Sequence, residues 1–127
     1  MNETDLSGKL RETIPEVMPY ALWVKHQQRG KRGTPDASLT WRRFTSWWEI
    51  KFWNEGPFTR YAQQDIRARQ FEERGVCYYV VYECRDDRKK VYIVKPSNLE
   101  SWQSSLIVSP GYNHVFVAEF MKSATNT

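Results

Sequence analysis

The stretch GTPDASLTWRRFTSWWEIKFW, residues 33–53, decides the fold that we predict for this chain of 127 residues. It is typical of two β-strands, DASLTW and FTSWWEIKFW, joined by a short link at Arg42-Arg43. Side chains alternate between the two faces of a strand, so Glu49 and Lys51 project from the same face of the second strand. Asp36 begins the first strand. The question is whether these charges form a site or only the solvent-exposed face of a hairpin.

The length of the Arg42-Arg43 link decides where Asp36 lies. With a two-residue loop, Trp41 pairs with Phe44 and Asp36 falls opposite Glu49. Directly opposed residues share one face of the sheet, with Cβ atoms about 4.5–5.5 Å apart. Two arginines are unfavourable in the tightest hairpin turns, so a longer loop remains an alternative. Any loop of even length keeps Asp36 on the face of Glu49, whereas an odd length separates the two.

Two carboxylates at this separation repel each other unless a cation lies between them. Asp36 and Glu49 have no cluster of Cys and His nearby, so we expect a hard, oxygen-preferring ion, Mg²⁺ or Mn²⁺. Such an ion polarises a phosphodiester and lowers the pKa of its bound water. Lys51 could orient that water or stabilise developing negative charge. The predicted chemistry is therefore phosphodiester hydrolysis.

These motifs resemble those of a nuclease superfamily. TPD at residues 34–36, followed by EIK at residues 49–51, resembles the PD-(D/E)xK pattern. The segments KRGTPDASL, WWEIKFW and QDIRARQFEERG are similar to the virus-type replication–repair (VRR-NUC) nucleases and the Holliday junction resolvases. The resemblance covers about residues 3–95. It implies a restriction-endonuclease-like core and a metal-dependent DNA endonuclease, with structure-specific cleavage of junctions or flaps among its variants.

The resemblance also implies roles for individual residues. Asp36 and Glu49 would be metal ligands, the carbonyl of Ile50 a third ligand, and Lys51 the catalytic lysine. Gln64, on the helix after the second strand, would support the site. The pattern of apolar residues around Gln64 independently predicts that it faces the sheet, where a core glutamine bonded to the backbone is the alternative interpretation.

Members of this group also place an acidic residue of the first helix near the metal. Glu3, Glu12 and Glu16 are the candidates in this sequence. Glu3 fits best, because of its distance ahead of the predicted strand ALWVKH.

The charge of the chain suits an anionic partner. It carries 19 basic and 15 acidic residues, a net charge of +4. Basic side chains gather in the glycine-containing loop just before Asp36, where a nucleic-acid backbone would have to pass. The residues predicted to bind nucleic acid are Lys25, His26, Arg29, Lys31 and Arg32 of this loop, together with Arg67. Arg67 lies one helical turn from Gln64, and a solvated helix flank is its alternative interpretation.

The chain is long enough for one domain, which we assign to residues 1–127, with a core at about 3–95 and a C-terminal extension at about 96–122. The predicted element order α-β-β-β-α-β-β-α indicates an α/β fold with a mixed central sheet flanked by helices. The first helix, starting near Asn2, is predicted to end at Pro15 and Pro19, and the last to span about residues 113–122.

The two cysteines, Cys77 and Cys84, are predicted on opposite faces of one strand and hence as free thiols. No segment is long and apolar enough for a membrane span. We therefore expect a cytoplasmic protein, of a size typical of phage or mobile-element genes. A junction resolvase cuts two strands symmetrically, which implies a homodimer. Two other functions are kept as alternatives: a DNA-binding protein that has the nuclease fold without cleavage, and a small protein-interaction domain.

Overall fold

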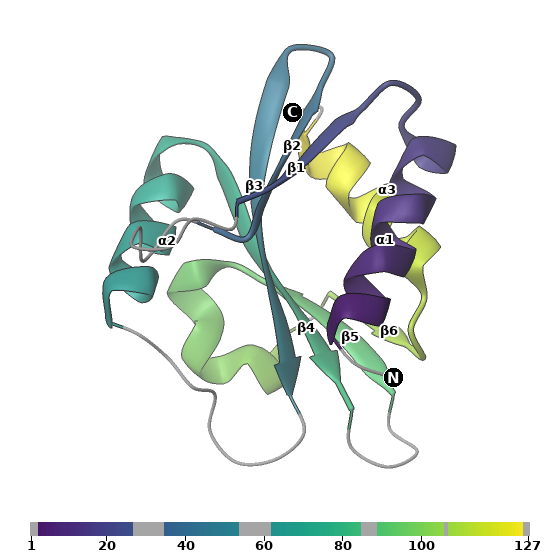
Figure 1. Ribbon diagram of the computed structural model, residues 1–127. Coiled ribbons are helices and arrows are strands. Elements are labelled where there is room, and N and C mark those ends of the chain that lie inside the picture. Colours follow the sequence, from purple (N-terminus) through teal and green to yellow (C-terminus); the bar gives the residue numbers. More distant parts are fainter. Residues whose placement is uncertain (1–2, 27–34, 54–61, 85–88, 106, 126–127) are drawn as a thin grey trace.

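A mixed six-stranded sheet forms the centre of the molecule, with the strands in the order β1-β2-β3-β4-β5-β6 (Figure 1). The structure, a computed structural model, describes residues 3–26, 35–53, 62–84, 89–105 and 107–125. The strands are β1 (Leu22–Lys25), β2 (Ala37–Trp41), β3 (Phe44–Trp53), β4 (Val76–Glu83), β5 (Lys90–Val94) and β6 (Val108–Pro110). The helices are α1 (Glu3–Val17), α2 (Ala62–Arg74), the 3₁₀ helix η1 (Pro96–Ser104) and α3 (His114–Thr125). The predicted α/β fold with a mixed sheet is confirmed.

Each strand of the sheet lies beside its neighbour in sequence, and the pairing of β3 with β4 is parallel. The other described pairs are antiparallel. A parallel pair needs a crossover connection, and α2 lies in that connection. This crossover sets α2 over the face of β3 from which Glu49 and Lys51 project.

Helices cover both faces of the sheet (Figure 1). One face, called here the α1–α3 face, buries Ile14 of α1 and Met121 of α3 against Trp48 and Ile50 of β3. The other, the α2 face, buries a smaller cluster formed by α2, η1 and the sheet. Its fully or nearly buried members include Ala68, Cys77, Tyr79, Val81, Leu99 and Trp102. The period-2 alternation of β3 therefore separates two hydrophobic cores, as its sequence predicts.

The β2–β3 hairpin has the register that places the two carboxylates together. Trp41 pairs with Phe44 and Ala37 with Trp48, so the link is the two-residue Arg42-Arg43 turn. Both arginines have left-handed backbone angles, with φ of 52° at Arg42 and 72° at Arg43. Positive φ at both central positions is the geometry of the type I′ turn that best matches the twist of a hairpin. The expected even loop length is confirmed.

The prediction that Pro15 ends the first helix is wrong. Pro15 lies inside α1, which continues to Val17. A proline in the last turn removes one backbone hydrogen bond, but burial of Ile14 and Met18 holds that turn against the sheet. The backbone N–H of Met18 still donates to the carbonyl of Ile14 at 2.8 Å. The helix stops before Pro19.

The C-terminal quarter is built into the same core as the rest of the fold. Val117, Ala118 and Met121 of α3 belong to the cluster that contains Trp48. The helix spans residues 114–125, three residues beyond the predicted end, and β6 adds a sixth strand that the sequence did not predict.

Cys77 and Cys84 are free and pack against different cores, which confirms their predicted placement on opposite faces. Among the described residues, no helix has the length and apolar character needed to cross a bilayer.

Candidate active site at the open end of the β2–β3 hairpin

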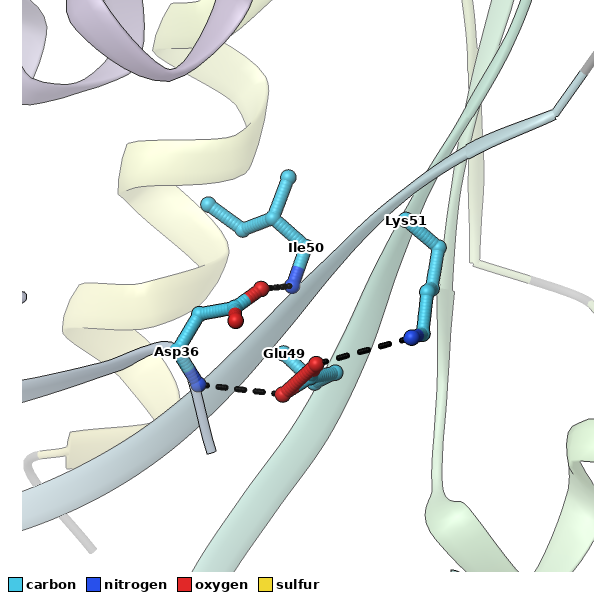
Figure 2. A network of polar contacts seen from close by, with 4 residues as sticks. All are labelled: Asp36, Glu49, Ile50 and Lys51. Atoms are coloured by element: carbon cyan, nitrogen blue, oxygen red, sulfur yellow. Dashed lines mark hydrogen bonds and ion pairs between the residues drawn. The ribbon is translucent and has the colours of Figure 1, made fainter. Parts of the chain in front are cut away.

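Asp36 and Glu49 meet where the β2–β3 hairpin opens, far along the strands from its turn (Figure 2). Asp36 occupies a bend just before β2, and the pairing of Ala37 with Trp48 carries on to place it opposite Glu49. The backbone N–H of Asp36 donates to Oε2 of Glu49 at 3.0 Å. In return, the backbone N–H of Ile50 donates to Oδ2 of Asp36 at 3.0 Å. Each carboxylate is thus held by a backbone donor from the other segment.

Lys51 lies beside the pair on the same face of β3. Its Nζ is 3.6 Å from Oε1 of Glu49. The Lys51 side chain is 19% exposed and that of Glu49 only 2%. The ammonium group is therefore reachable from solvent, whereas the carboxylate behind it is buried.

Burial raises the pKa of Glu49 from its usual 4.5 to about 8. Loss of solvation is the largest cause, and the negative charge of Asp36 is the next. Lys51 and the N–H of Asp36 favour the charged form but offset only part of this cost. A buried acid beside a second acid needs additional positive charge to remain ionised near neutral pH.

These donors fit a hard divalent cation. The site offers carboxylate oxygens of Asp36 and Glu49. The N–H and the carbonyl of a strand residue point to the same side of the strand. Because the N–H of Ile50 donates to Asp36, its carbonyl points to the side of Asp36 as well. Mg²⁺ is commonly held by one or two carboxylates while it keeps several waters. Within the described part of the chain, no group of three or more His, Cys, Asp or Glu side chains forms a metal cage.

His26 lies next to this site, on the α2 face. Its backbone N–H donates to the carbonyl of Asp36 at 2.6 Å, and its Nε2 is 2.8 Å from Oγ of Ser38. Its ring centroid is 5.3 Å from that of Trp47. The sequence analysis did not single out Ser38, although its place two residues after Asp36 on the same strand puts it on the α2 face.

The other predicted nucleic-acid contacts are placed differently. Lys25 pairs with Ala37, and strand alternation puts its exposed side chain on the α1–α3 face, opposite Glu49. Arg67 is exposed on α2, and its guanidinium donates to Oε1 of Gln70 at 3.4 Å. Arg29, Lys31 and Arg32 lie outside the described residues.

Two predicted supporting residues are placed by their backbone alone. Gln64 lies in the first turn of α2, and Glu3 is the first residue of α1. Their side chains lie outside the described part of the structure. Ala68 and Phe71, which share the predicted stripe of Gln64, do pack against the α2 face.

Trp47 packs beneath a helix. Its ring centroid is 4.6 Å from that of Phe71 of α2. Trp53, on the same face, lies 5.1 Å from Trp102 of η1 between centroids. These rings close one side of the site with apolar surface.

Comparison with known proteins finds likeness among solved structures. A scan against protein-family models finds no match, and a search of curated proteins finds no significant one. Among solved structures, the fold is similar to that of Hjc, a Holliday junction resolvase from Archaeoglobus fulgidus. The two share 16% sequence identity and a TM-score of 0.49 over 75% of this chain and 74% of that chain.

Proposed function

We propose that this protein is a metal-dependent DNA endonuclease that hydrolyses phosphodiester bonds. The observation that carries the proposal is the joint placement of Asp36, Glu49 and Lys51. Two carboxylates, one buried and one half-buried, lie together at the open end of a hairpin, with a partly exposed lysine 3.6 Å from the buried one. A sheet gains no packing from a buried acid beside a second acid, because burial of charge without compensation is costly.

Asp36, Glu49 and the carbonyl of Ile50 would hold the ion, Mg²⁺ or Mn²⁺. Such an ion, when bound, polarises the phosphate and makes a bound water more acidic. The chain's own contribution is positional. Backbone donors fix both carboxylates, and Lys51 places a positive charge where negative charge develops on the phosphate. The rings of Trp47 and Phe71 pack against each other on the same face of the sheet as the acids.

DNA is the substrate class that the charge pattern supports. The chain has a net charge of +4, and the basic residues of the sequence cluster just before Asp36. Phosphate contacts from Lys and Arg provide most of the affinity of such proteins for nucleic acid.

The test is cleavage of supercoiled plasmid, linear duplex, flap and four-way junction DNA with Mg²⁺. We expect Asp36→Asn and Glu49→Gln each to lower the rate at least about 1,000-fold, because each change removes a charged ligand of the ion. Glu73→Gln is the matched control, since Glu73 is an exposed carboxylate on α2 and its loss leaves the site intact.

Calorimetric titration with Mn²⁺ gives a readout that does not depend on turnover. The wild-type protein and Glu73→Gln should bind the ion, and Asp36→Asn should not. Equal cleavage by wild type and Asp36→Asn, or cleavage that persists in EDTA, would refute the proposed site.

A further inference from the structure

The turn of the β2–β3 hairpin breaks a local rule of hairpin construction. Type I′ turns favour Asn-Gly, because both central residues need positive φ. Here the two positions are Arg42 and Arg43, with φ of 52° and 72°. A side chain with a Cβ is strained in this region. Strained residues that persist in a fold often mark a functional surface.

The same turn concentrates positive charge. Arg42 and Arg43 are exposed, and Lys122 of α3 is close by, with its Nζ 5.8 Å from the centre of the Trp41 ring. The guanidinium carbon of Arg42 lies 4.2 Å from the centre of that ring. Trp41 is itself fixed, because its Nε1–H donates to the carbonyl of Pro19 at 3.1 Å. One arginine of the turn is thus held in a defined position by a cation–π contact.

No acidic residue of the hairpin lies near the turn. Residues 37–48 contain no Asp or Glu. In the described part of the structure, neither arginine forms an ion pair. In Figure 1 the turn that joins β2 and β3 projects at the top of the molecule. An uncompensated, projecting basic turn suits a polyanion.

Next to the turn, the two strands carry hydroxyl side chains on the α2 face. Thr40 and Thr45 are paired there, with their hydroxyl oxygens 2.9 Å apart at an exposed position. Hydroxyl groups are common donors to DNA phosphates. The hairpin therefore offers cations at its turn and a pair of hydroxyls beside it, on the face from which Glu49 projects.

We propose that the Arg42-Arg43 turn is a second DNA-contact site, which binds the duplex backbone about half a helical turn from the bond that is cut. Six residues separate Arg43 from Glu49, about 20 Å at the rise of an extended strand. One turn of B-DNA is about 34–36 Å long. This inference rests on the proposed endonuclease function.

The decisive variant is Arg42→Asn/Arg43→Gly, which gives the turn its preferred sequence and removes both charges. Binding of a 30-base-pair duplex is followed by fluorescence anisotropy in EDTA at several salt concentrations. We expect Kd to rise on the order of tenfold, and the slope of log K against log salt to fall in magnitude by about 2. The Tm should rise by a few degrees, because the strain is relieved.

Two controls distinguish a DNA contact made by the turn from a nonspecific effect of the protein's net charge. Arg42→Lys/Arg43→Lys keeps both charges and should keep the salt slope. Lys9→Gln/Arg11→Gln removes two exposed charges from α1 and should bind like wild type. On duplexes that end about 3 base pairs from the cut on the hairpin side, wild type and Arg42→Asn/Arg43→Gly should bind equally.

The outcomes distinguish this inference from the proposed function. Equal salt slopes for wild type and the Asn-Gly variant would overturn the inference, as would failure of wild type to bind duplex. A lower oligomeric mass for the variant, with unchanged DNA binding, would make the turn a contact between protein copies. Absence of cleavage with Mg²⁺ would refute the endonuclease proposal. A smaller salt slope for the Asn-Gly variant than for wild type would still support the DNA contact.

Discussion

The two faces of β3 differ in what they bury, although they alternate residue by residue along one strand. On the α1–α3 face, Trp48 and Ile50 are buried among apolar side chains of both helices. On the α2 face, Glu49 is as deeply buried as Ile50, and Lys51 lies beside it. The first face has the composition of a hydrophobic core. The second gives up apolar burial at its centre to hold charges, which indicates that stability and chemistry are divided between the faces.

The largest expected effect is the loss of the α1–α3 core. Trp48 is fully buried, its ring centroid lies 5.4 Å from that of Tyr78, and its Nε1–H donates to Oγ of Ser46 at 2.8 Å. We expect Trp48→Ala to lower the free energy of unfolding by about 3–5 kcal/mol, because it leaves a large cavity. Urea denaturation measures this loss. A loss below 1 kcal/mol would contradict the assignment of this face as the main core.

The matching change on the α2 face should affect activity and leave the fold intact. Lys51→Met keeps the aliphatic stem and removes the charge. We expect its cleavage rate to fall about 100- to 1,000-fold, as for loss of one preorganised electrostatic contact. At pH 6 the midpoint of urea denaturation should stay near that of wild type, since Glu49, with a pKa of about 8, is then protonated and gains little from the ammonium. If Lys51→Met lowered the stability and left the cleavage rate per folded molecule unchanged, Lys51 would contribute to the fold and not to the chemistry.

The smallest expected effect is a pH-dependent gain in stability from Glu49→Gln. The pKa of Glu49 is about 8 in the folded protein against a usual 4.5, so the folded state binds the proton more tightly. The wild-type protein therefore loses stability as pH rises from about 4.5 to about 8, and the neutral glutamine does not. Each pKa unit corresponds to about 1.4 kcal/mol. Because relaxation and water entry lower the cost of a buried charge, we expect only about one unit of this shift to appear as stability, so the variant should be about 1 kcal/mol more stable at pH 9.

Thermal unfolding in EDTA between pH 5 and pH 9 measures this difference. The two proteins should converge towards pH 5. Addition of Mg²⁺ at pH 9 should narrow the gap, because the ion stabilises wild type alone. A difference in stability that does not change with pH would show that burial does not raise the pKa of Glu49.

Much of the candidate site could be predicted from residues 33–53 alone. Strand alternation places Glu49 with Lys51, and the parity of the link places Asp36 opposite them. The physical basis is local, because period-2 alternation and hairpin register depend on neighbouring residues. The left-handed angles of Arg42 and Arg43 were not predictable from propensity, since two arginines disfavour that turn.

Other features depended on contacts distant in sequence. Pro15 stays within α1 because Ile14 and Met18 are buried against the sheet, a benefit that no helix signal in the sequence contains. The short strand β6 forms because β5 offers it an edge. The contact of His26 with Ser38 likewise requires β1 to pair with β2 across residues 27–34.

By itself, the sequence determined the alternation of β3, the dependence of the site on the parity of the hairpin link and the set of residues that resembles a nuclease motif. Only the tertiary structure decided that Glu49 is buried rather than solvated, because its burial comes from the parallel partner β4 and the cover of α2. That burial raises the pKa of Glu49 and makes the pair a candidate cation site. Local periodicity fixes the face on which a side chain lies, whereas packing of distant elements fixes how much water reaches it.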